Sequence, residues 1–393
     1  MHASRSALVC VVFAVTATIG CGESDNEPEV SPYQELYDAG VDRYLGAFEP
    51  SEVQQDGEVA SYFFDETVEG GPLCMRGAQF HASTQSTGSD DLLIFLKGGG
   101  ACWSELCFAL DLAGEPGIPA FDVFSDDADL NPFAGWNILY VPYCDGSLFA
   151  GDVETTNDDG EVIRHHRGLQ NLSAALDVGA AQFPDASRVV LAGSSGGGFG
   201  TIIGTPLVRQ LFPDAELLVV NDAGVGVLKG DEPEFLGDLI GEFNAEPFVP
   251  QSCPDCLDNG HLTDLVAWQL ENDTELKIAS FSSFDDGVIS GIFLQRPDGV
   301  FESDLRTEIL GLAAAYPERY MPFLIQGEQH TILLGSIAGF LGDEFAEGPN
   351  PFEAIVSLAR MSETTVSGTR FDEWLRWMLN DDPRWVPIIE AAE

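Results

Sequence analysis

The sequence Val-Val-Leu-Ala-Gly-Ser-Ser-Gly-Gly-Gly-Phe-Gly spans residues 189–200, and the rest of the chain can be interpreted outward from it. Its β-branched start predicts a strand, residues 193–197 form a Gly-x-Ser-x-Gly motif, and the segment 199–211 is compatible with a helix. Such a turn holds its central residue, Ser195, in a strained conformation that requires small neighbours. The Ser195 hydroxyl and the Gly196 amide then face the same space above a sheet. A glycine-rich turn that cradles a phosphate has the same pattern, so the choice depends on the rest of the chain.

Apolar runs of strand length alternate with helical segments along much of the sequence. The amphipathic segment 168–183 and the segment after Ser195 are predicted helices, and the predicted strands are residues 91–96, 136–142, 189–193, 216–221, 276–280 and 322–325. This alternation predicts an α/β fold, a doubly wound, mostly parallel sheet with helices on both faces. Residues 224–273 break the alternation. We interpret them as an insertion or lid over the carboxyl edge of the sheet, where such folds bind ligands.

A serine hydroxyl is a weak nucleophile, so it needs a base, and the base needs an acid that fixes its tautomer. His330 follows the predicted strand 322–325 by a short turn, which places it at the carboxyl edge of the sheet and downstream of Ser195. We interpret His165 and His166 as surface residues. His81 lies in a Ser/Thr-rich region, and His261 lies in the predicted lid. We therefore expect His330 to be the base.

The acid is expected between the serine and the histidine. The predicted strand 276–280 leads into Asp285 and Asp286 at the same edge of the sheet, and the order Ser, Asp, His is the one that α/β-hydrolases use. One of two adjacent acids usually faces water, and we favour Asp285 as the carboxylate that orients the imidazole, with Asp286 as the alternative. Asp222, after the strand 216–221, is a third candidate that fits a structural role better.

Acyl transfer also needs hydrogen-bond donors for the oxyanion of the tetrahedral intermediate. Gly98, Gly99 and Gly100 follow the predicted strand 91–96, as expected of a loop that adds an amide to that of the residue after the nucleophile. A glycine triplet alone is weak evidence. Together with a Gly-x-Ser-x-Gly motif about a hundred residues later, it favours a serine hydrolase over a phosphate-binding turn.

The charge of the chain restricts its partners. Its 393 residues include 65 acidic and 17 basic ones, which gives a formal net charge of −48. Such a field repels nucleic acid, anionic lipid surfaces and a fully de-esterified polyuronate, so we expect none of them as partners. The predicted chemistry needs no metal and no cofactor.

The amino terminus predicts export. Residues 1–21 combine a short basic start, an apolar stretch too short to span a bilayer and a Gly20-Cys21 pair that resembles a bacterial lipoprotein cleavage box. We expect Cys21 to carry a lipid anchor, with simple secretion as the alternative. Residues 22–32 are acidic and proline-containing and predict a flexible tether, which leaves 33–393 as a single catalytic domain.

Six cysteines remain after Cys10 and Cys21 are set aside, and an even number in an exported chain favours disulfides. Fifteen pairings are formally possible. Cys253 and Cys256 are spaced as in some metal and redox sites, but a zinc ion needs more thiolate or imidazole ligands than the one nearby histidine, His261, offers. A local disulfide between these two cysteines is therefore expected.

Two stretches carry a family resemblance. Residues 96–102, Leu-Lys-Gly-Gly-Gly-Ala-Cys, with Cys107 close behind, resemble the Leu-Glu-Gly-Gly-Gly-Trp-Cys stretch of the pectin acetylesterase and Notum family of carboxylesterases, serine hydrolases with an α/β-hydrolase-like fold. Residues 143–149, Tyr-Cys-Asp-Gly-Ser-Leu-Phe, are similar to that family's Tyr-Cys-Asp-Gly-Ser-Ser-Phe. The serine motif, Phe284-Asp285 and Gln329-His330 follow in the family's order, and the resemblance extends from about Gly71 to His330.

The resemblance implies roles for individual residues. It implies that Ser195, Asp285 and His330 form a catalytic triad. It also implies that Gly99, Gly100 and Gly196 form the oxyanion hole, and that Cys102–Cys107 and Cys74–Cys144 are disulfides. The chain departs from the family where Lys97 replaces an acidic residue, where Ala101 replaces an aromatic one and where Gly196 stands in place of alanine. The aromatic residue missing at position 101 widens the expected acyl pocket, which puts acetyl specificity in question.

The sequence as a whole predicts a serine carboxylesterase that removes a small acyl group, in the simplest case acetyl, from a polysaccharide or similar alcohol. One alternative is an esterase for longer acyl chains or polyesters. The other is a non-catalytic binding protein on a hydrolase scaffold, which would predict a missing triad member. The oligomeric state is not predicted.

Overall fold

The computed structural model of the protein describes residues 31–335 and 357–391. The predicted export signal, Cys21 and most of the predicted tether lie outside the described residues. From Pro32 onwards the described chain forms one compact unit. No helix in this part of the chain is long and apolar enough to cross a membrane.

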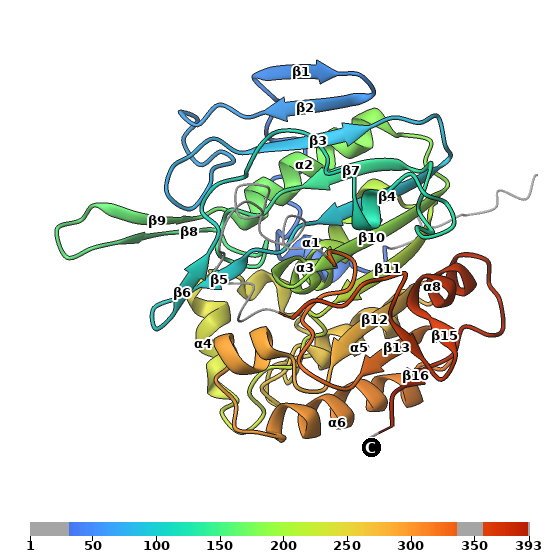
Figure 1. The fold of residues 1–393 in the computed structure, drawn as a ribbon. Helices are drawn as coiled ribbons and strands as arrows, with labels where there is room; N and C mark the ends of the chain where they lie inside the picture. The colour runs from blue at the N-terminus through green and yellow to red at the C-terminus, as the bar shows by residue number, and fades with distance from the viewer. Residues whose placement is uncertain (1–30, 336–356, 392–393) are drawn as a thin grey trace, which may run out of the picture. The chain divides into compact units, whose positions relative to one another are not determined.

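The main sheet has ten strands in the described part of the chain, in the order β1-β2-β3-β7-β4-β10-β11-β12-β13-β16 (Figure 1). Seven neighbouring strands run parallel: β7 (Asn137–Val141), β4 (Asp91–Leu96), β10 (Arg188–Ser194), β11 (Glu216–Asp222), β12 (Lys277–Ser283), β13 (Tyr320–Ile325) and β16 (Ile388–Ile389). The other three form an antiparallel edge: β1 (Glu52–Asp56), β2 (Val59–Phe63) and β3 (His81–Gln85). The predicted strands therefore form, and the predicted mostly parallel sheet is confirmed.

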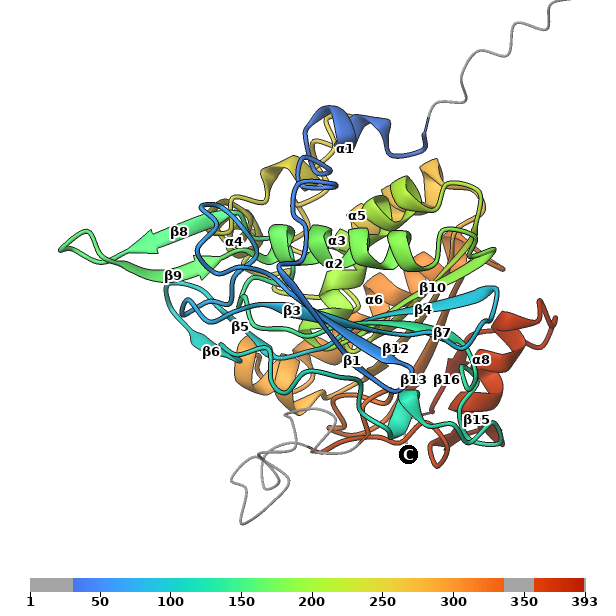
Figure 2. The ribbon, with the colours of Figure 1, turned by 90° about the horizontal axis from the view of Figure 1, so that it is seen from above.

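The central strands are apolar throughout because both faces of the sheet are covered. In β10, Val189 and Leu191 belong to one core layer, and Val190 and Ala192 belong to the other. One layer is covered by the helices α2 (Gly168–Gln182), α3 (Gly196–Leu211), α5 (Thr263–Asn272) and α6 (Val300–Ala315). The other is covered by the short η1 (Asp122–Phe124) and by α8 (Phe371–Leu379), and Figure 2 shows α3 and α8 on opposite sides of the sheet. The doubly wound α/β class is confirmed.

Smaller elements surround the carboxyl edge of the sheet. The predicted lid region 224–273 contains α4 (Glu234–Glu242), the short η2 (Glu246–Phe248) and α5. A π-helical segment, η3 (Gly287–Phe293), follows β12. The remaining elements are α1 (Gln34–Asp38) and three two-stranded hairpins, formed by β5 (Gly100–Cys102) and β6 (Cys107–Ala109), by β8 (Val153–Thr156) and β9 (Val162–His166), and by β14 (Thr365–Val366) and β15 (Thr369–Arg370).

Three disulfides connect these elements, and they are the three pairs that were expected: Cys74–Cys144, Cys102–Cys107 and Cys253–Cys256. Cys102–Cys107 joins paired residues of the β5–β6 hairpin, directly after the glycine triplet. Cys253–Cys256 closes a short loop within the predicted lid region. The pairs implied by the family resemblance are therefore present in the fold.

Candidate active site

Ser195 occupies the sharp turn between β10 and α3. Its backbone has φ 57° and ψ −120°, a conformation that non-glycine residues rarely adopt and that is associated with functional strain. The flanking glycines are required because a Cβ atom at Gly193 would lie 2.1 Å from the Gly197 carbonyl oxygen, and one at Gly197 would lie 2.0 Å from the Leu96 carbonyl oxygen. The predicted strand, turn and helix around Ser195 thus form as expected.

His330 follows β13 at the same edge of the sheet and contacts Asp286. Its Nδ1 atom lies 2.9 Å from each carboxylate oxygen of Asp286, and both side chains are fully buried. The Asp286 Oδ1 atom also accepts hydrogen bonds from the backbone N–H groups of Val288 and Ile289 at the start of η3. The carboxylate is therefore held in place from two directions.

The preference for Asp285 over Asp286 is wrong, because Asp285 is exposed and Asp286 holds the imidazole. Partial burial and the nearby carboxylates of Glu302 and Glu328 raise the pKa of Asp285 above its ordinary value. The physical reason for the reversal is local. Asp286 is the residue that caps η3, and capping turns its carboxylate inward, while the preceding side chain points to solvent.

The contact with Asp286 sets the tautomer of His330. The carboxylate accepts from Nδ1–H, which leaves Nε2 as the basic nitrogen. A buried imidazole oriented in this way can take a proton from a serine hydroxyl and return it to a leaving group.

The other histidines have structural surroundings. His166 and His81 are buried, and burial lowers the pKa of each to about 4. The interpretation of His166 as a surface residue is therefore wrong, whereas His165 is partly exposed. The Nδ1 atom of His261 accepts a hydrogen bond from the backbone N–H of Leu228 at 2.9 Å, within the predicted lid region.

The glycine triplet lies against the serine turn. A Cβ atom at Gly98 would lie 2.4 Å from the Ser194 carbonyl oxygen and 2.8 Å from the Ser195 Cβ atom, and one at Gly196 would lie 3.0 Å from the Gly100 carbonyl oxygen. Gly196 is the first residue of α3, so its N–H has no acceptor within the helix and lies at the positive end of the helix dipole. The structure thus brings the two predicted glycine segments together, and their role as oxyanion donors stays a prediction.

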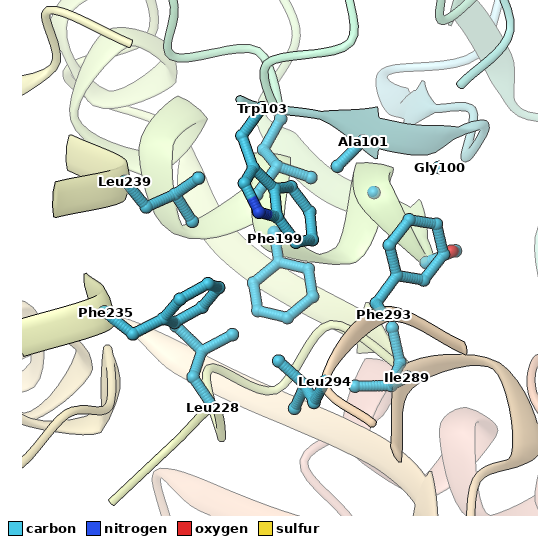
Figure 3. Close-up of a pocket in the computed structure, with 13 residues that line it drawn as sticks. Gly100, Ala101, Trp103, Phe199, Leu228, Phe235, Leu239, Ile289, Phe293 and Leu294 are labelled. Atoms are coloured by element: carbon cyan, nitrogen blue, oxygen red, sulfur yellow. The ribbon is translucent and has the colours of Figure 1, made fainter. Parts of the chain in front are cut away.

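A strongly apolar pocket opens beside Ser195 (Figure 3). It encloses about 420 Å³ of empty space, its open mouth included. The lining comes from five parts of the chain: the glycine and β5 segment (Gly100, Ala101, Trp103), Leu148, the serine turn and the start of α3 (Ser195, Gly196, Phe199), the predicted lid region (Leu228, Phe235, Leu239) and the segment of η3 and the residue after it (Ile289, Phe293, Leu294).

Several of these lining residues were not anticipated. Ser195, Gly100, Gly196 and Ala101 were predicted site residues, whereas Trp103 was not. The ring of Trp103 packs edge-on to that of Phe235, with 5.7 Å between the ring centroids. The apolar sequence Val-Ile-Ser-Gly-Ile-Phe-Leu at 288–294 is the signal that could have identified the η3 wall. It follows directly after the acid and is too apolar for a solvent-exposed loop.

The strand order, the strained serine turn and the chain order of Ser195, Asp286 and His330 define a fold of the α/β-hydrolase class. Comparisons with known proteins show which family part of the chain resembles. Residues 52–232 match the family model described as Pectinacetylesterase. The matched region includes Ser195 and the glycine triplet, whereas Asp286 and His330 lie beyond it.

Relatives of two kinds match part of the chain. Pectin acetylesterase 4 of Arabidopsis thaliana is 33% identical over 171 residues, which cover 40% of this chain and 41% of the relative. Pectin acetylesterase 5 of the same plant is 31% identical over 209 residues, 47% of this chain and 48% of the relative. Palmitoleoyl-protein carboxylesterase notum2 of Xenopus laevis is 30% identical over 172 residues, 40% of this chain and 30% of the relative.

In each case the chain spans less than half the length of the curated relative that it matches. Residues 52–232 are therefore similar to the pectinacetylesterase family, and part of the chain is also similar to the Notum carboxylesterases.

Proposed function

We propose that the protein is a serine carboxylesterase in which Ser195 is the nucleophile, His330 the base and Asp286 the orienting acid. The observation that carries the proposal is the buried contact between His330 Nδ1 and both carboxylate oxygens of Asp286, at the sheet edge where the strained Ser195 turn lies. All three triad members are present, which disfavours a non-catalytic binding protein on the same scaffold.

The proposed reaction follows from this arrangement. Ser195 Oγ attacks the ester carbonyl while His330 Nε2 takes the hydroxyl proton, and Asp286 stabilises the resulting imidazolium. The amides of Gly99, Gly100 and Gly196 are proposed to bind the oxyanion. The C–O bond to the alcohol then breaks as the imidazolium returns its proton to the leaving oxygen. Water repeats the sequence on the acyl-enzyme and releases the carboxylic acid.

The pocket beside Ser195 supports an apolar acyl group longer than acetyl. The space is lined by Trp103, Phe199, Phe235 and Phe293, and an apolar lining of this kind favours a hydrocarbon chain. Burying one methylene group is worth about 0.8 kcal/mol, so each methylene that enters the pocket should raise kcat/KM about fourfold. From acetate to butyrate, the expected gain is roughly 15-fold.

A series of p-nitrophenyl esters from acetate to dodecanoate tests both the activity and the acyl preference. We expect kcat/KM to rise from acetate, reach a maximum and fall once the chain no longer fits. The Ser195→Ala variant is the control and should hydrolyse none of the esters. A steady fall in kcat/KM from acetate onwards would overturn the longer acyl preference, and inactivity of the native protein toward every ester would overturn the esterase itself.

Removal of acetyl groups from a polysaccharide is the second candidate, favoured by the relatives that are named pectin acetylesterases. The net charge of −48 disfavours a fully de-esterified polyuronate and leaves neutral or highly esterified polysaccharides. Acetate release from a panel of acetylated polysaccharides, with Ser195→Ala as control, tests this candidate. Release at a kcat/KM above that for butyrate esters would favour it over the longer acyl group.

Export is supported by the three disulfides, which form and persist in oxidising compartments. A lipid anchor at Cys21 remains a proposal. Expression of the full chain and its Cys21→Ser variant in a bacterial host, followed by fractionation, tests it. We expect the native chain in the membrane fraction and the variant in a soluble or unprocessed form, whereas identical fractionation would argue for simple secretion.

A further inference from the structure

Asp222, the third acidic candidate, connects to the serine turn through both its backbone and its side chain. It is the last residue of β11 and pairs with Ser194 at the end of β10. Its carbonyl oxygen accepts a hydrogen bond from the Ser195 N–H at 2.8 Å, and its Oδ2 atom accepts one from the Ser194 hydroxyl at 2.6 Å. The position of Ser195 therefore depends on Asp222 at two points.

The same carboxylate also holds the segment that follows His330. The backbone N–H of Ile332 donates to Oδ1 of Asp222 at 3.0 Å, and that of Leu333 donates to Oδ2 at 2.9 Å. These residues are two and three positions after His330, and both are buried. One carboxylate thus joins the chain segments of the proposed nucleophile and the proposed base.

The Asp222 carboxylate lies where burial disfavours its charged form. Asp222 is fully buried, and burial raises its pKa to about 6, although its hydrogen bonds to Ser194 and to the backbone of 332–333 oppose the rise. The positive charge of a protonated His330 also stabilises the charged form of Asp222. The interaction is mutual, so an ionised Asp222 stabilises the imidazolium that forms during catalysis.

We propose that Asp222 is a positioning residue that fixes Ser195 relative to His330 and supplies a second negative charge near the imidazolium, behind that of Asp286. The inference rests on the proposed esterase function. It gives a separate role to a carboxylate that does not touch the reacting atoms. It also explains why a third acid remains buried at this edge of the sheet.

The Asp222→Asn variant removes the charge and one of the two acceptor atoms. An asparagine oxygen can still accept from Ser194 and Leu333, but its amide nitrogen then faces the Ile332 N–H, which is also a donor. We expect kcat to fall about 10²-fold, as for a small misplacement of reacting groups. Because the imidazolium loses a nearby negative charge, the acidic limb of the pH–rate profile should also move about one unit to lower pH.

The Ser194→Ala variant gives an independent test and keeps the charge. It removes a hydrogen bond that favours the ionised form of Asp222, so this carboxylate should become protonated at a higher pH. A more readily protonated Asp222 stabilises the imidazolium less, so we expect the acidic limb to move to lower pH, as in Asp222→Asn but by less, with a smaller loss of kcat. Shifts in the same direction, graded with the charge that is lost, are not expected from a general loss of stability.

The matched control is Asp273→Asn. Asp273 is also a buried carboxylate, but it lies before β12, at the opposite edge of the sheet, and bonds to Arg209 at 2.9 Å. Its loss should lower the melting temperature without moving the pH–rate profile. The experiment measures kcat, KM, melting temperature and the pH–rate profile with a p-nitrophenyl ester for the native protein and the three variants.

Each outcome is decisive. Shifts of the acidic limb to lower pH in Asp222→Asn and, by less, in Ser194→Ala support the positioning role, and Ser194→Ala alone decides by its direction if Asp222→Asn does not fold. A limb that stays in place in the folded variants, with only the melting temperature lowered as in Asp273→Asn, overturns the role and leaves the esterase intact. Absence of activity in the native protein overturns the proposed function and this inference together.

Discussion

Replacing Asp286 with asparagine should remove almost all activity without unfolding the site. The Asp286 Oδ1 atom accepts from the backbone N–H groups of Val288 and Ile289, at 2.9 Å and 2.8 Å, and an asparagine oxygen can keep both bonds. The amide nitrogen then takes the place of Oδ2, 2.9 Å from His330 Nδ1. The amide N–H is a donor where Oδ2 was an acceptor, so it favours the tautomer in which Nδ1 accepts and Nε2 carries the proton.

The magnitude follows from the lost tautomer. With Nε2 protonated, His330 cannot accept the proton of Ser195, and the corresponding substitution in a serine protease triad lowers kcat by about 10⁴. KM should change little, because Asp286 does not line the acyl pocket. The assay is hydrolysis of p-nitrophenyl butyrate, with the melting temperature of each variant as a measure of folding.

Asp285→Asn is the matched control because the two acids are adjacent and differ in orientation. Asp285 is exposed, so its replacement should change kcat by less than about threefold, within the range of surface substitutions. If Asp285→Asn lost more activity than Asp286→Asn, or if both folded variants retained full activity, the assignment of the acid would be refuted.

Other predictions concern packing, pocket size and charge. Gly98→Ala should lower kcat by at least about 10²-fold, because its Cβ would lie 2.4 Å from the Ser194 carbonyl oxygen; activity within a few fold of native would contradict the close approach. Gly311→Ala, in the interior of α6 with open space around it, should raise the free energy of unfolding by about 0.5–1 kcal/mol in denaturant titrations. Ala101→Phe should narrow the pocket and lower the ratio of octanoate to acetate hydrolysis, and an unchanged ratio would place the acyl group elsewhere. The net charge of −48 predicts a melting temperature that rises between low salt and about 1 M NaCl, which a thermal scan can check.

The strands of the fold could be predicted because their apolar runs are continuous. A parallel strand covered on both faces has no polar side to interrupt it, and β10 shows this with Val189 and Leu191 in one core layer and Val190 and Ala192 in the other. Ser195 and His330 could be placed for the same reason, since Ser195 follows such a strand directly and His330 follows one by a short turn. The parallel direction of the strands then brings both residues to one edge.

The acid and the pocket could not be predicted in the same way. Asp285 and Asp286 follow the same strand, and nothing in the length of the run determines which side chain turns inward. The capping rule offers the missing signal: an aspartate whose carboxylate can accept from N–H groups two and three residues later favours the start of a helix. Asp286 precedes the apolar segment that forms η3, and its carboxylate accepts those two hydrogen bonds.

The pocket depends on tertiary contacts that leave little trace in the sequence. Its lining residues Trp103, Phe235 and Phe293 lie on three separate segments, and the rings of Phe235 and Phe293 come within 5.7 Å and 6.3 Å of the ring of Trp103. That Trp103, two positions after Ala101, contributes an aromatic ring to the pocket can be identified only when the fold shows which side chains line it.

The acid and one wall of the pocket are positioned by the same short helix. Asp286 caps η3, and η3 carries Ile289 and Phe293 into the pocket. A change that disrupts the cap should therefore alter both the base and the acyl preference, whereas Asp286→Asn keeps the cap oxygen and should alter the base alone. Comparison of Asp286→Asn with Asp286→Ala separates the two effects. The alanine variant loses both bonds to Val288 and Ile289, so its residual activity should also show a changed ratio of octanoate to acetate hydrolysis. An equal ratio in both variants would mean that η3 holds its position without the Asp286 cap.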